Sequence, residues 1–158
     1  MQKVLSALCL ASAILLNACG DGNNKATTQN DSSPSSTATV DKAVDDKKGV
    51  GKFKNVEIAP ALDNTMATAG EAISKTKCLS CHKLSDERLV GPGWKDVTTR
   101  RTPEWIMNFI TNTEEMLSKD PEAIASLEIC LVRMPNQNLN DEEARQVYEY
   151  MRKNDGVK

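Results

Sequence analysis

Apolar and polar positions divide the chain of 158 residues into three parts. Residues 4–16 form an apolar run that only Ser6 and Ser12 interrupt. Residues 20–62 are mostly Gly, Asn, Ser, Thr, Asp and Lys, and Phe53 is their only aromatic residue. From residue 63 onward, apolar residues return at the spacing of helices that each bury one face. The pattern predicts one folded domain, residues 63–158, preceded by two segments of different character.

Four helices are expected in residues 63–158. The first runs from about residue 65 to residue 79. Two more begin at Thr102-Pro103-Glu104 and at Asp120-Pro121-Glu122, where a capping side chain precedes a proline suited to the first helical turn. The last begins at the Asn140 cap, continues with three acidic residues favoured by the helix dipole, and ends near Gly156. No strand-like alternation competes, so the fold class predicted is all-α.

The first 18 residues have the features of a signal peptide. Lys3 and the amino terminus supply positive charge, and the apolar run after them is too short to span a bilayer comfortably. The run ends in Leu16-Asn17-Ala18-Cys19, which resembles the bacterial lipoprotein signal. This resemblance implies cleavage before Cys19 and a diacylglycerol on its thiol. An ordinary secreted protein, cut near the same place, is the alternative.

Residues 19–62 are then expected to be a lipid-anchored flexible linker, because their composition offers little apolar surface to bury. Phe53, Val56 and Ile58 are an exception near its end. Their density leaves open whether the last ten residues of this segment dock on the domain.

Composition narrows the classes of function. The net charge is −2, and from residue 61 onward there are 13 basic and 16 acidic residues, so nothing favours a nucleic-acid partner. Aromatic residues make up only 4%, which suggests that a non-protein group completes the core. The five cysteines, at positions 9, 19, 78, 81 and 130, are odd in number and irregularly spaced, unlike a disulfide framework.

The sequence Cys78-Leu79-Ser80-Cys81-His82 is a C-x-x-C-H motif and contains the only histidine. On a helix these spacings share a face, so two thiols can bond the two vinyl groups of one haem while His82 binds its iron. A thioredoxin-like dithiol would need a strand before the motif, where a helix is predicted. A zinc site with Cys130 is the other alternative, although adjacent Cys81 and His82 fit poorly around one tetrahedral ion.

A second axial ligand must come from methionine, lysine or water, unless the position is open, because no histidine remains. Four methionines are best explained by packing or by their place before the motif: Met66, Met107, Met116 and Met151. Met134 differs, because it precedes Pro135 in an irregular segment that leads into the last helix. Met134 is therefore the predicted ligand.

Three segments together resemble the class I c-type cytochromes: the C-x-x-C-H motif, Val90-Gly91-Pro92-Gly93-Trp94-Lys95-Asp96-Val97, and the stretch from Met134 to Ala144. The resemblance implies a cytochrome c-like fold of about four helices around one covalently bound haem c. It implies axial ligation by His82 and Met134, with the Pro92 carbonyl accepting a hydrogen bond from the histidine's other nitrogen. Trp94 is expected to pack at the haem edge.

The same resemblance implies that the first and last helices cross at Gly70. Ser74 stands where the family often has an aromatic residue, so the sequence departs from the family pattern at this crossing. Arg100 and Arg101 are candidates for pairing with a haem propionate, or are simply solvated. Cys130 is left without an assigned role.

The function expected is that of a monohaem electron carrier rather than an enzyme, because two axial ligands leave no open coordination position. It is expected outside the cytoplasm, held to a membrane through Cys19, with respiratory redox proteins as donor and acceptor and with no small-molecule substrate. The alternative is a haem-based gas sensor or ligand-binding module in which Met134 is labile. A peroxidase-like enzyme would need an open site and usually a second haem.

Overall fold

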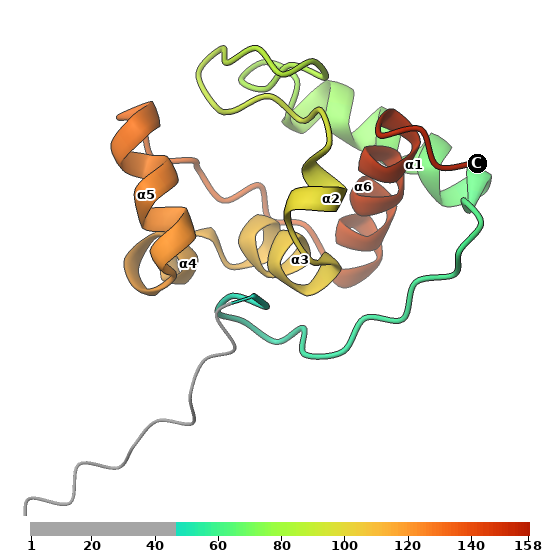
Figure 1. The fold of residues 1–158 in the computed structure, drawn as a ribbon, viewed down its shortest axis with the longest axis horizontal. Helices are drawn as coiled ribbons and strands as arrows, with labels where there is room; N and C mark the ends of the chain where they lie inside the picture. Colours follow the sequence, from blue (N-terminus) through green and yellow to red (C-terminus); the bar gives the residue numbers. More distant parts are fainter. Residues whose placement is uncertain (1–46) are drawn as a thin grey trace, which may run out of the picture. The chain divides into compact units, whose positions relative to one another are not determined.

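A computed structural model of the chain describes residues 47–158. This part contains six helices and no strand (Figure 1), which confirms the all-α prediction: α1 (Asn64–Lys77), α2 (Val97–Arg100), α3 (Pro103–Thr111), α4 (Thr113–Lys119), α5 (Pro121–Cys130) and α6 (Asp141–Asn154). None of these helices is long and apolar enough to cross a membrane. The expected signal peptide, Cys19 and most of the expected linker lie outside the described residues.

Three helices begin where the sequence predicts, because each cap makes its hydrogen bond. The Thr102 hydroxyl accepts from the backbone N–H of Trp105 at 3.2 Å, and the Asp120 carboxylate accepts from that of Ala123 at 2.9 Å. The side chain of Asn140 and that of Glu143 accept from each other's backbone N–H, both at 2.9 Å, in a complete capping box.

Two helices, α2 and α4, have no counterpart in the expected four. The Asp155 carboxylate, at the end of α6, holds α2 by accepting from the backbone N–H groups of Asp96 at 2.7 Å and Thr98 at 2.9 Å. In α4, Met116 is fully buried. Both helices depend on tertiary contacts that the local sequence does not reveal.

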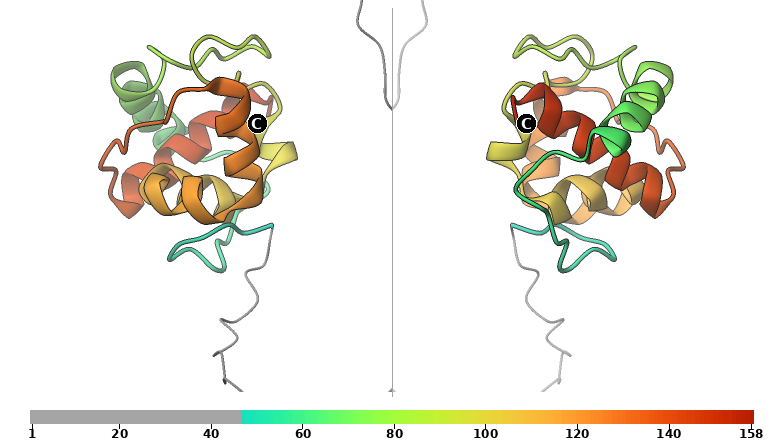
Figure 2. Two further views of the ribbon diagram at one scale, coloured as in Figure 1. Left: turned by 90° about the vertical axis from the view of Figure 1, so that its left-hand side faces the viewer. Right: turned by 90° about the vertical axis from the view of Figure 1, so that its right-hand side faces the viewer.

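The first and last helices cross as expected, and they lie against each other in both views of Figure 2. Gly70 sits at the crossing, where a Cβ atom would lie 2.0 Å from the carbonyl oxygen of Gln146. Ser74, one turn further along α1, is fully buried. The crossing therefore forms with a small side chain where the family often has an aromatic one.

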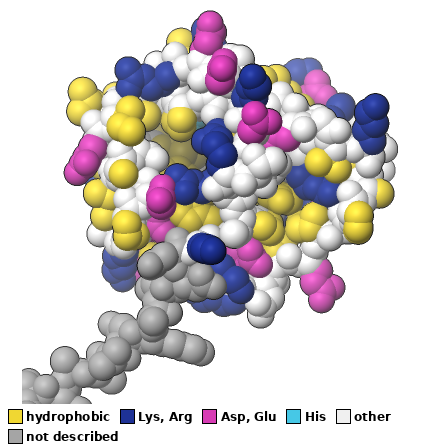
Figure 3. Space-filling model, viewed as in Figure 1, with side chains coloured by type: hydrophobic (Ala, Val, Ile, Leu, Met, Phe, Trp, Pro, Cys, Tyr) yellow, Lys and Arg dark blue, Asp and Glu magenta, His cyan; other side chains and the backbone are white. Residues whose placement is uncertain are grey.

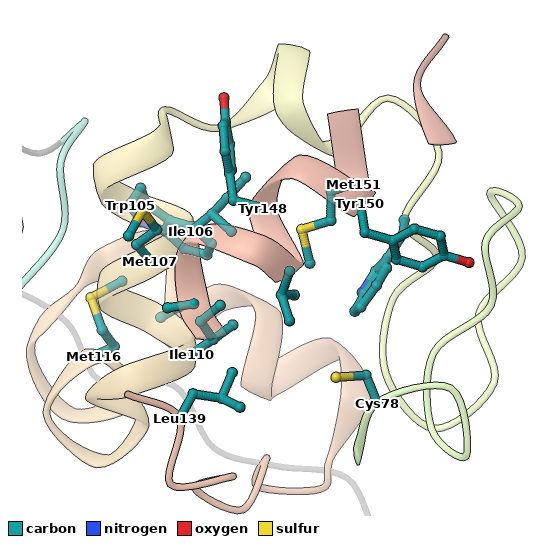
Figure 4. Close-up of a cluster of buried hydrophobic side chains, with 14 of the residues drawn as sticks. Cys78, Trp105, Ile106, Met107, Ile110, Met116, Leu139, Tyr148, Tyr150 and Met151 are labelled. Carbon is teal, nitrogen blue, oxygen red and sulfur yellow. The ribbon is translucent and has the colours of Figure 1, made fainter. Parts of the chain in front are cut away.

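The core lies where α3, α4 and α6 meet the chain that follows α1 (Figure 4). Trp105 stacks on Phe109 with ring centroids 5.1 Å apart, and its indole N–H donates to the buried Asp120 carboxylate at 3.1 Å. Cys78 belongs to the same buried cluster as the helix residues, and its thiol points into the space that Leu139 faces. The core therefore reaches the C-x-x-C-H motif.

Residues 47–62, called the strap below, pack on the helices and correct the expectation of a flexible linker up to residue 62. The fully buried Asn108 of α3 accepts from the backbone N–H of Phe53 and donates to the carbonyls of Lys48 and Phe53, each at 2.9 Å. The Glu104 carboxylate accepts from the N–H of Val56 at 2.8 Å. Phe53, Val56 and Ile58 pack against the core, a possibility that the sequence left open.

The C-terminal end of the strap is held by α6. Arg152 donates to the carbonyls of Ala59 at 2.8 Å and Pro60 at 3.0 Å, and pairs with the buried Glu149 at 2.8 Å. Because the strap's polar backbone groups are matched by these side chains, it packs as part of the domain. The domain's packed chain therefore begins before residue 63.

Replacing Gly70 with alanine should destabilise the holoprotein by about 1–3 kcal/mol, because the added Cβ has no room against the backbone of α6. In a solvent-exposed helix the same change stabilises the folded state by about 1 kcal/mol. The sign of the change in the free energy of unfolding therefore shows whether the two helices are in close contact at Gly70. Urea unfolding measures it. Thr68→Ala, an exposed change on α1, is the control and should move the free energy of unfolding much less. A Gly70→Ala variant as stable as the wild type would contradict the close approach.

Candidate functional site

The two cysteines and the histidine of the motif lie on a turn that continues α1. The backbone N–H groups of Cys81 and His82 both donate to the Cys78 carbonyl at 3.0 Å. This turn brings all three side chains to the wall of one cavity. Cys78 is buried and Cys81 half-buried, and both are free thiols. Burial raises the pKa of the Cys78 thiol, and the neighbouring Ser74 hydroxyl partly opposes that rise.

A hydrogen bond of 2.8 Å joins Nδ1 of His82 to the carbonyl oxygen of Pro92. Because a carbonyl only accepts, Nδ1 carries the proton and Nε2 keeps a free lone pair. Burial lowers the pKa of His82, and the bond to Pro92 opposes part of this shift. The ring is thus held neutral and oriented, in the tautomer that a metal-binding imidazole needs.

The loop after the motif folds closely over the imidazole. The backbone N–H groups of Val90 and Gly91 donate to the Cys81 carbonyl at 3.2 and 2.9 Å. A Cβ atom on Gly91 would lie 2.3 Å from Cε1 of His82, so only glycine allows this approach. Trp94 is buried and lines the cavity, and its ring centroid lies 5.6 Å from that of His82.

Met134 is half-buried and lines the same cavity, from the irregular segment between α5 and α6. The structure therefore gathers every candidate of the described part around one space: Cys78, Cys81, His82, Pro92, Trp94 and Met134. Met107 and Met116 are buried in the core and do not line the cavity. Met151, which the sequence assigned to packing, is a core residue that also reaches the cavity wall.

The space between these residues amounts to about 1280 Å³ when the part that is open to solvent is counted. Its walls are predominantly apolar, and Figure 3 shows a recess lined by hydrophobic side chains with basic side chains at its rim. The hydrophobic wall residues outside the motif include Val97, Ile106, Phe109, Ile110, Leu117, Leu127, Leu139 and Val147. This space fits a large, flat, apolar group that forms one bond with the thiol of Cys78 and one with the thiol of Cys81.

Three arginines also line the cavity, and they differ in their partners. Arg101 pairs with Glu122 at 2.6 Å, and Arg133 pairs with Glu114 at 3.0 Å. Arg100 donates to the carbonyls of Gly93 at 3.3 Å and Lys95 at 2.9 Å, and none of the described carboxylates forms an ion pair with it. Arg100 is therefore the cavity arginine best suited to a carboxylate of a bound cofactor. The sequence indicated Arg100 and Arg101 but missed Arg133.

Cys130 ends α5 as a free, half-buried thiol and also lines the cavity. Within residues 47–158, no group of three or more His, Cys, Asp or Glu side chains is arranged to hold a metal ion. The described chain also lacks the strand that a thioredoxin-like dithiol requires. Neither alternative to haem therefore has support in the geometry.

Comparison with known proteins agrees with this geometry. The family model for cytochrome c matches residues 67–155. The cytochrome c from Rhodothermus marinus is 35% identical, with a TM-score of 0.64, and the match covers 66% of this chain and 90% of that one. An engineered form of the same protein, whose structure holds a carbene intermediate, is 34% identical over the same shares, with a TM-score of 0.61.

None of the curated proteins compared matches the chain. The matched family segment nevertheless contains the C-x-x-C-H motif, the Pro92 loop, Met134 and the two crossing helices. Members of this family carry one covalently attached haem c and act in electron transfer. The chain belongs to the cytochrome c family, whose members bind one covalently attached haem c, and it has the class I fold.

Proposed function

We propose that the chain is a membrane-tethered, extracytoplasmic cytochrome c that carries single electrons between respiratory redox partners. The observation that carries the proposal is that His82, with its Nδ1 fixed on Pro92, and Met134 line the same apolar cavity. The family supplies the general role, and its members typically work outside the cytoplasm. The tether and the partners are the specific content of the proposal.

Bound in this cavity, haem c supplies an iron that alternates between the ferrous and ferric states. In our proposal Nε2 of His82 and the thioether sulfur of Met134 would hold the iron, and together they would leave no position for a substrate. A methionine thioether favours the ferrous state and so raises the reduction potential. Apolar walls exclude water, which keeps the surroundings of the site nearly the same in both states.

The tether is proposed from the lipoprotein-like signal at Leu16-Asn17-Ala18-Cys19. Acyl chains on Cys19 would hold the protein at a membrane surface, since each buried CH₂ contributes roughly 0.8 kcal/mol. Residues 19–46 would connect this anchor to the strap. Anchoring raises the effective concentration of the domain at the surface where respiratory complexes lie.

Met134→Ala should remove the weak far-red charge-transfer band that a bond between ferric iron and methionine sulfur gives. The wild type should show the band, and its ferrous form should resist carbon monoxide, whereas the variant should bind it readily. Met66→Ala is the control, because Met66 lies on α1 and does not line the cavity. Ready binding of carbon monoxide by the wild type would favour the gas-binding module and would overturn the carrier.

Arg100→Gln should lower the reduction potential, by an amount on the order of tens of millivolts. A positive charge beside the site disfavours the ferric state, and its loss therefore favours oxidation. Potentiometric titration measures the shift. Lys75→Gln removes one positive charge from the exposed face of α1, away from the cavity, and should change the potential less. Equal shifts in both variants would show that Arg100 acts only through net charge.

Cys19→Ser should abolish incorporation of labelled palmitate and release the protein into the soluble fraction. Cys9→Ser is the matched control, because Cys9 would be discarded with the signal peptide. Palmitate labelling and membrane fractionation measure the two effects. A Cys19→Ser protein that stays in the membrane fraction would show that the anchor lies elsewhere.

A further inference from the structure

Every large hydrophobic side chain that is exposed in the described part of the chain belongs to one of two short segments. These side chains are Leu89, Val90, Ile129, Leu131 and Val132, and their exposed fractions run from 39% to 84%. Single exposed apolar residues are normal on protein surfaces, but a group confined to two segments is not. We call these five residues the collar.

The two segments of the collar are neighbours in space. Arg88, next to Leu89, donates to the carbonyl of Ile129 at 2.6 Å and so ties the loop after the motif to the end of α5. Val90 from one segment and Val132 from the other both line the proposed haem cavity, where a bound haem would cover part of them, whereas the other three residues of the collar do not line it. The collar is therefore continuous with the cavity wall and lies at its opening.

Charge within the two segments that carry the collar is nearly balanced. Residues 86–90 and 128–133 contain three acidic and two basic side chains. Arg133 is paired with Glu114 at 3.0 Å, and Glu87 is paired with Lys83 at 2.6 Å. A partner with a strongly charged docking face would find no complementary field here, whereas an apolar, nearly neutral face would gain from burying the collar.

The strap begins at the end of the domain that lies away from this surface. Its first described residue, Lys47, accepts a hydrogen bond at its carbonyl from the Thr102 hydroxyl, at the start of α3, at 2.7 Å. In Figure 1 the start of the strap lies below α3 and α4, whereas the loop after α1 and the C-terminal end of α5 lie at the top. The described chain therefore begins at the end of the domain opposite the collar.

We propose that the collar is the docking surface through which this protein exchanges electrons, and that its partner is a redox protein with an apolar docking face of little net charge. This inference rests on the proposed electron-carrier function. In each productive encounter, one electron passes from the ferrous protein to a ferric partner, no bond forms or breaks, and no proton moves. Association is driven by burial of the collar rather than by charge.

Electron self-exchange tests the proposal, because a second copy of this chain carries the same apolar face and serves as the probe. The rate is measured by nuclear magnetic resonance in mixtures of ferrous and ferric holoprotein of the Cys19→Ser chain. For that parent chain, we expect the rate to change less than about twofold as salt is raised from low to high concentration, since neutral faces are little affected by screening.

Lysine placed in the collar should slow self-exchange. Leu89→Lys and Leu131→Lys lie in different segments, and neither residue lines the cavity. Each should lower the rate by about tenfold at low salt, with partial recovery at high salt, because two like charges now meet. Ala72→Lys adds the same charge at an exposed position on α1 and is the matched control. Retention of the far-red band shows that each variant keeps its site.

A cross-reaction sharpens the test. Exchange between the Leu131→Lys and Leu131→Glu proteins should be faster than self-exchange of either, and this advantage should shrink as salt is raised. Collar variants that behave like Ala72→Lys would overturn the docking surface, as would a parent rate that rises steeply with salt. Binding of the Cys19→Ser holoprotein to phosphatidylcholine vesicles, lost in the collar variants, would assign the collar to the membrane instead. In all these outcomes the far-red band still tests the carrier function separately.

Discussion

The hydrogen bond between His82 and the Pro92 carbonyl is the contact on which the site depends. It sets the tautomer, and with it the nitrogen that faces the cavity. The bond forms only because the loop carrying Pro92 can approach the imidazole, and this approach requires a residue without a Cβ at position 91. The Cys81 carbonyl fastens the same loop by accepting from two backbone N–H groups. The turn that carries Cys78, Cys81 and His82 and the loop that carries Pro92 therefore form one unit. Within it, Nδ1 of His82 is positioned by a backbone carbonyl rather than by another side chain.

An apolar recess that opens to water would be costly in a domain stabilised by protein contacts alone, because its lining is not buried. The chain has few aromatic residues to fill such a space, and several of them, including Trp94, Trp105 and Phe109, line it instead. Filling by a large cofactor resolves this deficit, and covalent attachment at Cys78 and Cys81 keeps the group in place when the surrounding helices fluctuate. The cofactor thus completes a hydrophobic core that the side chains alone leave unfilled.

The sequence predicted those parts of the fold that depend on local chemistry. Thr102, Asp120 and Asn140 cap their helices within a few residues of themselves, and C-x-x-C-H acts within one turn, so each leaves a readable local pattern. Helix α2 could not be found this way, because the carboxylate that holds it comes from Asp155, far along the chain. The strap was hidden for the same reason: Asn108 and Arg152 satisfy its backbone groups from α3 and α6. Of the site, the Met134 segment was readable from sequence, whereas the ion pairs that distinguish Arg100 from its neighbours were not.

The start of the strap and the collar lie at opposite ends of the domain. A strap joined to the helices by buried groups such as Asn108 fixes the point at which the chain leaves toward its proposed anchor. This point lies at the end of the domain away from the collar. Had residues 47–62 been a free linker, the same chain could have folded back across the cavity opening and competed with a partner for the apolar side chains there. Ordering the strap therefore protects the opening, because the apolar residues of the strap are already partly buried against the core of the domain.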